Sequence, residues 1–400
     1  MAGLATAALM AKSGKSVCIM DPAGSAGGCI AAHEIAGFRF TAGPAITYGF
    51  EQGGVLEQLY ADLGLSAGAV SSFPGYQVVM PEHRITVSSD PRETLEELIR
   101  EFPDRKSDLT RLYREVYKIS DRSSKNRLAS YISRQRNAAA YLQSYRFGKS
   151  LYAYFDVQSH FFFGSSLRRL PLASLVLMLT SPPHYLPGGF TLLADRLISM
   201  VQQLNGDWFH DEPYPELLLR SNRITGIRTS RGDIEPRTVL LNGPGEQSES
   251  VRFLGIRDEV IPVGMLSNVI CLDDDDRPDA FYTFVLSPAD EGMSAPAGMR
   301  SLTATFTPAL PPDQAAESCV SRLTPVVPFL QNYLVTASPQ DSHERRFPIP
   351  STVTVKSPEF RQGRPMFSPC SVKNLKIIRD SVRTLVPAVY TAQVLAKRLK

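Results

Sequence analysis

The amino-terminal stretch 1–28 constrains the fold more than any other part of the chain. Small and apolar residues recur at helical spacing from Met1 until Gly14, a residue that can end a helix in the left-handed conformation. The short apolar run Val17 to Met20 is typical of a strand that a parallel sheet buries on both faces, and Asp21 stands at its carboxyl end. This order predicts the second half of a dinucleotide-binding βαβ unit.

In a full unit a strand runs into G-x-G-x-x-G, the helix amino end holds a pyrophosphate, and an acid about 20 residues on binds ribose hydroxyls. Gly3 fits the last glycine and Asp21 fits the acid. The preceding strand and first two glycines have no counterpart in this sequence. A chain beginning at Met1 would therefore leave two strands with unpaired edges, and we expect it to be less stable and to retain a cofactor poorly. An ordinary αβ unit without nucleotide is the alternative.

Length, charge and cysteine content limit the class of protein this chain can belong to. A length of 400 residues suits two or three domains, or one discontinuous two-domain protein. The net charge of +3 gives no reason to expect nucleic acid. Five cysteines without a C-x-x-C pair indicate neither a disulfide framework nor a zinc site, so we expect a cytoplasmic protein without a metal. The apolar run Leu170 to Thr180 is too short to span the roughly 30 Å of hydrocarbon in a bilayer.

Further patterns predict local structure. Gln77 to Thr86 alternate as in a strand pair, and Asn374 to Ile378 are expected to form a buried strand. The acids Asp273 to Asp276 are too densely spaced for a calcium loop and indicate a solvated loop.

Several motifs follow one another along the chain: the glycine pair Gly27-Gly28, G-F-R-F-T-A-G at 37–43, G-G-V-L at 53–56, P-G-G at 187–189, Asp380-Ser381, and V-P-A-V at 386–389. In this order they resemble the carotenoid (phytoene) desaturases and carotenoid isomerases, FAD-dependent oxidoreductases related to the flavin amine oxidases. That family carries a glycine pair, G-F-x-F-D-x-G, G-G-x-L, P-x-G-G, G-D-S and V-P-x-V. The resemblance also implies a hairpin at Glu216 to Arg228 and a strand at Thr238 to Asn242.

The resemblance implies an α/β protein with a discontinuous, Rossmann-like FAD-binding domain whose first strand is missing, at 1–70, 186–250 and 345–400. It also implies an inserted α+β domain at 71–185 and 251–344 that faces substrate and membrane. By the same resemblance Asp21 holds the adenosine ribose, the glycine pair lets the chain pass the cofactor, and Asp380 lies near the ribityl chain. The full set of FAD contacts it implies is Gly3, Leu4, Asp21, Gly27, Gly28, Gly43, Asp380 and Val389.

Three positions depart from the family pattern. Thr41 replaces the usual aspartate, Cys29 stands where many members have a basic residue, and Arg379 replaces the glycine before Asp380. An arginine there either blocks close backbone approach or adds a phosphate partner. The glycine-rich loop after Ser381 is also shortened. These departures put retention of FAD in question.

The resemblance implies dehydrogenation or cis-trans isomerisation of a long hydrophobic polyene. The sequence offers no nucleophile with a base and no paired carboxylates, which suits chemistry done by a cofactor, and it names no catalytic residue. One alternative is a flavin oxidase of another substrate, such as an amine. The other is a truncated or degenerate relative that binds a hydrophobic partner without FAD and is no enzyme.

Two stretches bear on a hydrophobic partner. Leu151 to Leu186 is the most apolar part of the chain. Three interpretations are open: the lining of a pocket for a hydrocarbon, a surface that enters a bilayer, or the packed core between domains. Leu95 to Leu142 is helical and rich in Lys and Arg, as suits anionic lipid head groups or a solvated face. We expect peripheral membrane association. His160 and His184 have no companion acid at a recognisable spacing and are expected to be structural.

Overall fold

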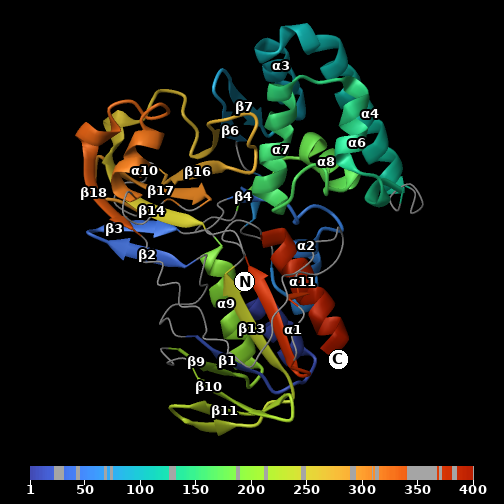
Figure 1. Cartoon of the computed structure of the whole chain (residues 1–400), viewed down its shortest axis with the longest axis vertical. Coiled ribbons are helices and arrows are strands. Elements are labelled where there is room, and N and C mark those ends of the chain that lie inside the picture. The colour runs from blue at the N-terminus through green and yellow to red at the C-terminus, as the bar shows by residue number, and fades with distance from the viewer. Residues whose placement is uncertain are drawn as a thin grey trace.

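The computed structural model forms three lobes (Figure 1). The lower lobe holds both chain ends, the upper left lobe is mainly sheet, and the upper right lobe is mainly helical. The structure describes residues 1–21, 31–41, 46–66, 70–72, 75–125, 132–185, 190–210, 215–244, 249–288, 294–308, 310, 315–339, 367–368, 372–380 and 385–399.

The lower lobe combines parallel strand pairs with four helices, as the predicted Rossmann-like unit requires. Strand β1 (Cys18–Met20) pairs in parallel with β9 (Asp207–Phe209), and β13 (Val239–Pro244) pairs in parallel with β20 (Leu375–Asp380). Strand β19 (Phe367–Ser368) adds an antiparallel edge to β20. The helices are α1 (Ala2–Lys12), α2 (Val55–Leu63), α9 (Thr191–Gln203) and α11 (Leu385–Leu399).

Helix α1 lies at the centre of the packing in this lobe. Its small alanine side chains let neighbouring helices approach closely, and Ala2, Ala5 and Ala8 are fully buried. The packed neighbours are α2, α9 and α11, which share one apolar core with it. The helix ends before Gly14, whose φ of 80° is the left-handed conformation expected from the sequence.

The sheet beside α1 is divided. Among the strands that the structure describes, β1 is hydrogen-bonded to β9 alone and β13 to β20 alone on its sheet. Helix α1 nevertheless contacts β1, β13 and β20. One helix therefore bridges two pieces of parallel sheet.

The predicted hairpin of the lower lobe is present as β10 (Glu216–Arg220) and β11 (Arg223–Thr229), with β12 (Gly232–Ile234) added at its edge. Asn374 ties this hairpin to the strand β20 that follows it: its side chain accepts from the Ile224 amide at 2.9 Å and donates to the Ile224 carbonyl at 2.8 Å. Both bonds are buried, so a single amide side chain fixes the two sheets to each other.

The upper left lobe contains a seven-stranded sheet with the order β18-β14-β17-β16-β15-β6-β7, in which only β15 and β6 run in parallel. Its apolar core lies between the sheet and helix α10 (Ala315–Leu323). The strands are β6 (Gly75–Val79), β7 (Arg84–Ser88), β14 (Ser250–Arg257), β15 (Asn268–Leu272), β16 (Phe281–Leu286), β17 (Met299–Thr307) and β18 (Leu334–Pro339).

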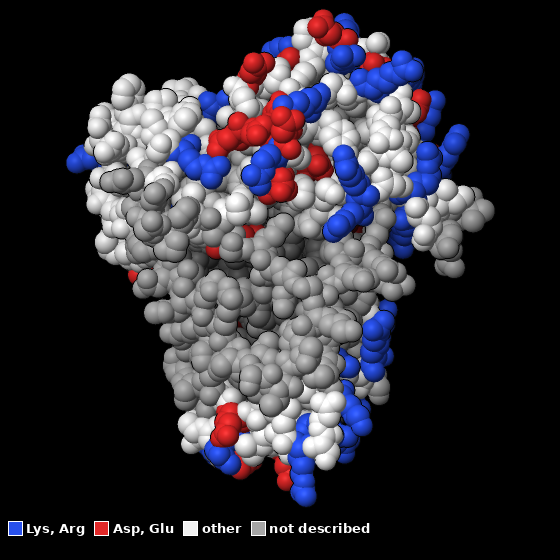
Figure 2. Space-filling model, viewed as in Figure 1, with Lys and Arg blue, Asp and Glu red and all other residues white. Residues whose placement is uncertain are grey.

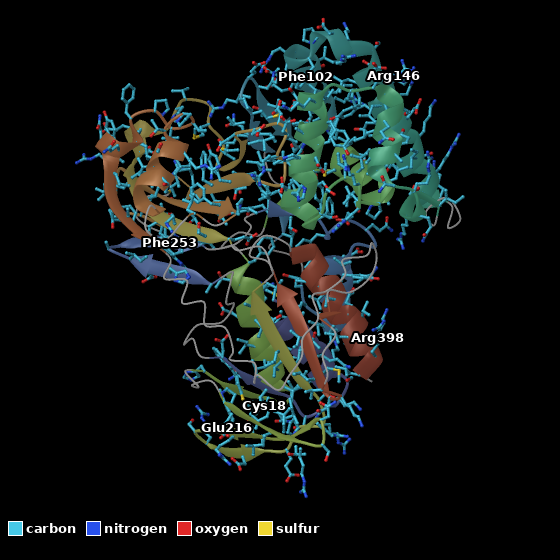
Figure 3. All side chains as sticks on the ribbon, viewed as in Figure 1. Cys18, Phe102, Arg146, Glu216, Phe253 and Arg398 are labelled. Carbon is cyan, nitrogen blue, oxygen red and sulfur yellow. The ribbon has the colours of Figure 1, made fainter. Side chains whose placement is uncertain are left out.

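A hairpin from the amino-terminal region covers the other face of this sheet. Strands β2 (Ala32–Ile35) and β3 (Phe38–Thr41) bring the ring of Phe40 within 4.9 Å of the ring of Phe253. Figure 3 labels Phe253, which lies on β14 next to this hairpin. A Cβ at Gly255 would lie 2.6 Å from the Phe38 ring, so glycine admits this close contact. The hairpin packs on the seven-stranded sheet, where Phe38 and Phe40 share an apolar cluster with Val251 and Phe253.

The upper right lobe is a helical cap. Asp90 begins it by accepting from the Arg92 amide at 2.8 Å, with proline in the first turn of α3. The elements that follow are α3 (Pro91–Glu101), the short 3₁₀ turn η2 (Pro103–Arg105), α4 (Lys106–Lys125), α6 (Ala138–Leu142), η3 (Gln143–Tyr145), α7 (Lys149–Phe163) and α8 (Leu172–Thr180).

The most apolar stretch of the sequence is the core of this cap. Most side chains of α7 are buried, and α8 packs against α4. The described part of Leu151 to Leu186 therefore forms packed interior, the plainest of the three interpretations. No described helix is both long and apolar enough to span a membrane. A small three-stranded sheet of β4 (Ile46–Thr47), β8 (His184–Tyr185) and β5 (Ser71–Ser72) joins the cap to the lower lobe.

Candidate cofactor site

The candidate site lies where the carboxyl ends of the lower-lobe strands meet the amino end of α1. A short turn, 13–17, joins α1 to β1, so the helix runs back along the strand and its first residues are level with the strand's last. The label N marks this helix end near the middle of the molecule (Figure 1). Ligands of open α/β sheets bind at this edge.

Gly3 brings α1 against the sheet. A Cβ at Gly3 would lie 3.2 Å from the Cβ of Asn242 on β13, closer than two carbon atoms normally approach. This is the close helix-to-strand packing that the third glycine of a dinucleotide motif permits. Asn242 itself is exposed. Gly206 has a similar role before β9, where a Cβ would lie 2.5 Å from Cγ1 of Val201.

Asp21 follows the last residue of β1, as the sequence predicted. Its backbone amide donates to the Phe209 carbonyl at 3.0 Å, which continues the parallel pairing with β9 by one residue. The side chain is half-buried at the carboxyl edge. An acid therefore stands at the strand end where such folds bind ribose hydroxyls, and its contact with a ribose stays a prediction.

Trp208 is a residue that sequence reasoning missed. It pairs with Ile19 across β1 and β9, and its ring lies 5.4 Å from that of His210. Its indole nitrogen is buried and has no hydrogen-bond partner among the described residues. A lone tryptophan in a short strand gives no periodic signal, and only the pairing of β9 with β1 places it beside Ile19, against the helical core.

Asp380 is the last residue of β20 and pairs with Pro244 at the end of β13. On β13 that position lies two residues beyond Asn242, the neighbour of Gly3. Gly3 and Asp380 therefore lie close to the same end of the same strand pair. Arg379, the departure from the family pattern, is paired with Gly243 within the strand.

The remaining site predictions have different outcomes. Leu4 is half-buried on α1 and packs on the helical core, and Val389 of α11 is fully buried in that core among Ala388 and its neighbours. Neither position tests a contact with cofactor. Gly27, Gly28 and Gly43 lie outside the described residues. No cluster of three or more metal-ligating side chains occurs in the described part of the chain.

Two histidines near the apolar core are perturbed by burial. Burial lowers the pKa of His160 on α7, and the nearby Asp156 and Asp279 carboxylates oppose this shift. Burial also lowers the pKa of His184 on β8, whose Nδ1 has no hydrogen-bond partner among the described residues and whose ring lies 5.9 Å from Phe50. Both imidazoles are therefore kept neutral more firmly than usual.

Burial raises the pKa of Asp156 on α7, while its carboxylate accepts from the Leu167 amide at 2.6 Å. Asp156 lies one helical turn before His160. The sequence offers this acid at i, i+4 spacing, so the prediction that His160 lacks a companion acid was wrong.

The close approach of α1 to the sheet at Gly3 and the acid Asp21 after β1 fit an adenine dinucleotide. Tight helix-to-strand packing and an acid at the end of the neighbouring strand are features of such a site. The residues expected to pass the flavin ring fall largely outside the described ranges.

Comparison with known proteins agrees with this fold. Residues 1–63 match the family model described as an NAD(P)-binding Rossmann-like domain. A search of curated proteins found no match.

Three solved structures are similar along nearly the whole chain. An oxidoreductase from Methanosarcina mazei has a TM-score of 0.61 at 12% identity, with 99% of this chain and 98% of the other covered. A putrescine oxidase variant redesigned in cofactor binding has a TM-score of 0.56 at 14% identity, covering 100% and 96%. A Rab GDI from Plasmodium falciparum has a TM-score of 0.66 at 10% identity, covering 99% and 93%. The chain therefore has the Rossmann-like fold of the FAD-dependent oxidoreductases, as the sequence predicted.

Proposed function

We propose that this chain is an FAD-dependent oxidoreductase that acts on a long hydrophobic polyene by desaturation or cis-trans isomerisation. The observation that carries the cofactor part is the 3.2 Å approach of Gly3 to Asn242, with Asp21 and Asp380 at the ends of β1 and β20. The family match over 1–63 supports the same interpretation, although its description names NAD(P).

When bound, FAD supplies the hydride or electron acceptor for the reaction. The role of the chain's residues is to bind and orient it. Asp21 would accept hydrogen bonds from ribose hydroxyls, and the positive dipole end of α1 would attract the phosphates. Asp380 would hold a hydroxyl at the end of β20. The catalytic residue remains unnamed.

The substrate class rests on the resemblance to the carotenoid desaturases and isomerases. The described apolar residues do not add to it, because they are packed core. Oxidation of an amine is the second candidate, and the similarity in fold to a putrescine oxidase favours it.

A non-enzymatic role is the third candidate. The Rab GDI shares this fold along nearly the whole chain, and its name describes no oxidoreductase, so the fold alone does not separate enzyme from binding protein. Thr41 and Arg379, two departures from the family pattern, also favour a relative that no longer binds FAD.

Titration of the purified protein with FAD tests the cofactor first. Flavin fluorescence should be quenched on binding, and Asp21→Asn should weaken binding by about 10- to 100-fold, since a hydrogen bond to a charged group contributes about 1.5–3 kcal/mol. Asp207→Asn is the matched control, because Asp207 is an exposed carboxylate at the opposite end of the same strand pair. No quenching by the parent protein, or equal loss in both variants, would reject the FAD site.

The substrate is tested with the loaded protein. Anaerobic reduction of bound flavin by a polyene but not by putrescine supports the first candidate, and the reverse result supports the second. Folded protein that binds polyene without taking up FAD supports the non-enzymatic relative.

A further inference from the structure

Arg252 is a buried arginine on β14 that the proposed function does not use. The residue is only 8% exposed, and arginines are almost never buried to this extent unless they are paired. Its neighbours Val251 and Phe253 belong to the apolar cluster under the β2–β3 hairpin, whereas Leu254 belongs to the cluster against α10. Because side chains alternate along a strand, Arg252 points to the α10 side of the sheet.

The thiol of Cys319 agrees with this placement. Cys319 lies on α10 and is 1% exposed. Burial raises the pKa of its thiol to about 12, and the positive charge of Arg252 opposes that shift, which requires the guanidinium to be close to the sulfur. The guanidinium therefore lies between the seven-stranded sheet and α10, beside an apolar core.

No counter-charge accompanies Arg252. It forms no ion pair within the described part of the chain. Its Nη1 donates to the Val251 carbonyl at 2.8 Å, and its Nε is buried without a hydrogen-bond partner among the described residues. A buried charge is normally both paired and hydrogen-bonded, because its removal from water is costly. Arg252 therefore lacks the acceptor that its burial requires.

Two other arginines of this lobe show how such a charge is normally held. Arg322 on α10 donates twice to the Asp273 carboxylate, at 3.0 and 2.6 Å. Arg300 on β17 donates to the Asp258 carboxylate at 3.1 Å. Both are half-buried, whereas Arg252 is buried. The arginine with the greatest need of a carboxylate is thus the one of the three that has none.

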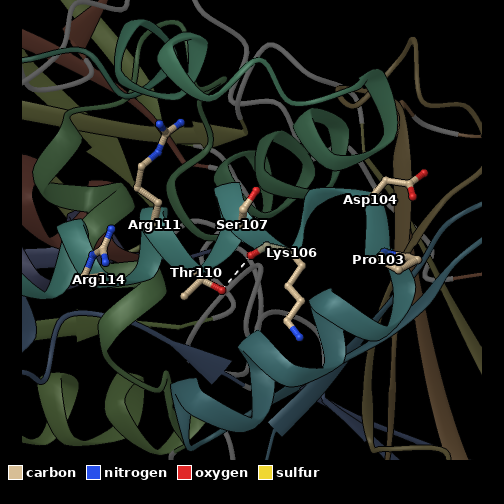
Figure 4. Close-up of a pocket in the computed structure, with 7 residues that line it drawn as sticks. All are labelled: Pro103, Asp104, Lys106, Ser107, Thr110, Arg111 and Arg114. Atoms are coloured by element: carbon tan, nitrogen blue, oxygen red, sulfur yellow. Dashed lines mark hydrogen bonds between the residues drawn. The ribbon is translucent and has the colours of Figure 1, made fainter.

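Exposed cations have no such need, because water solvates them. A depression of about 460 Å³ at the start of α4 is lined by Pro103, Asp104, Lys106, Ser107, Thr110, Arg111 and Arg114 (Figure 4). Lys106 and Arg111 extend in different directions there, and Arg111 pairs with Asp108 at 2.8 Å. Figure 2 shows the upper left lobe mostly uncharged on the face in view, with the largest acidic group toward the centre of the molecule. The unbalanced charge of that lobe is therefore internal.

The free edge of the Arg252 guanidinium fits a carboxylate. Nη1 is occupied by the Val251 carbonyl, whereas Nε and Nη2 carry the parallel N–H groups that match the two oxygens of a carboxylate. The surroundings are apolar: Ala304 is paired with Arg252 across β17, and Phe306 and Cys319 belong to the same cluster. A monoanion with a short alkyl part suits one cation in such surroundings, whereas a phosphate dianion brings one charge too many.

We propose that Arg252 binds the carboxylate of a small monocarboxylic acid between β14 and α10. The two oxygens accept from Nε and Nη2, and the alkyl part lies against the apolar cluster. Binding adds the counter-charge that the folded chain lacks, so it stabilises the folded state over the unfolded one. The site lies on the side of the sheet away from the β2–β3 hairpin, and neither flavin nor polyene enters the argument. The proposal therefore stands or fails apart from the proposed function.

Thermal unfolding of the full chain with sodium propionate, followed by circular dichroism, tests the proposal. Propionate should raise the melting temperature of the parent protein and should reach saturation. Propionamide, which has the same shape without the charge, and sodium chloride at the same ionic strength should not raise it. Arg252→Met should abolish the response to propionate. Arg252→Lys keeps the charge but loses the parallel N–H groups, so it should weaken the apparent Kd about tenfold.

The variants give a second result in the absence of propionate. Because an unpaired buried charge destabilises the fold, Arg252→Met should melt at a higher temperature than the parent protein in chloride, and saturating propionate should reduce this difference. Arg322→Met is the matched control, since it removes a paired arginine on the same side of the sheet. It should melt at a lower temperature than the parent and keep the full response to propionate.

Three results would overturn the proposal. A lower melting temperature of Arg252→Met in chloride would show that the chain itself supplies the counter-charge. Equal stabilisation by propionamide would assign the effect to the alkyl part alone, and stabilisation by inorganic phosphate but not by propionate would assign Arg252 to another anion. Loss of the propionate response in Arg322→Met as well as in Arg252→Met would show that the effect does not depend on the unpaired arginine.

Discussion

Replacing Gly3 by alanine tests whether close packing of α1 on β13 holds the candidate site together. The added Cβ would lie 3.2 Å from the Asn242 Cβ and 3.5 Å from its Cγ. The optimal van der Waals separation of two carbon atoms is about 3.5–4.0 Å, so the contact between the two Cβ atoms is too short by about 0.3–0.8 Å. Rotation of the exposed Asn242 side chain moves its Cγ but not its Cβ. Only a shift of the helix or strand backbone relieves the contact.

Two effects of this substitution oppose each other. Alanine in place of glycine favours a helix by about 1 kcal/mol, and overpacking a tight contact costs about 1–3 kcal/mol. We expect Gly3→Ala to lower the free energy of unfolding by about 1 kcal/mol. In an Asn242→Gly background the opposing atoms are gone, so the same change should instead raise the free energy of unfolding.

Urea unfolding followed by circular dichroism measures both effects, and FAD titration shows whether moving α1 weakens binding. Gly148→Ala is the control, since a Cβ there meets no atom within 4 Å. Equal destabilisation by Gly3→Ala with and without the Asn242 side chain would show that the helix-to-strand contact is not the cause, and the reasoning would fail.

Two further predictions concern the cap and acid stability. The Tyr76 hydroxyl donates to the Gln158 side chain at 2.5 Å inside the core, so Tyr76→Phe should cost about 1–3 kcal/mol in urea unfolding, and Gln158→Leu in the same chain should recover part of it. Burial lowers the pKa of His33, His160 and His184 below the ordinary 6.5, so the unfolded chain binds protons there that the folded chain refuses. The free energy of unfolding should therefore fall as the pH drops from about 7.5 through about 6.5, and His160→Gln should flatten this slope, whereas an unchanged slope would contradict the assignment.

The sequence was sufficient for elements whose cause is local. Alanines followed by Gly14 specify where α1 ends, and the strand pair near Gln77 formed where alternation predicted it. The hairpin from Glu216 to Arg228 formed where the family resemblance placed it. Asp21 follows β1 where the sequence predicted the strand to end, because the end of a strand is set by local sequence. Its contact with a ribose stays a prediction.

What the sequence left open depends on contacts between distant residues. Whether the apolar stretch in α7 and α8 was pocket, membrane surface or core depended on what covers it, and α4 and β6 supply that cover. The hairpin bearing Phe40 joined the seven-stranded sheet because Phe253, more than two hundred residues away, offered its apolar partner. Trp208 became relevant only through the pairing of β9 with β1. Local periodicity fixes which face of a helix or strand is apolar, but only tertiary packing decides which residues cover that face. The reason is that the free energy of burial depends on the apolar area removed from water, so different partners can bury the same face equally well.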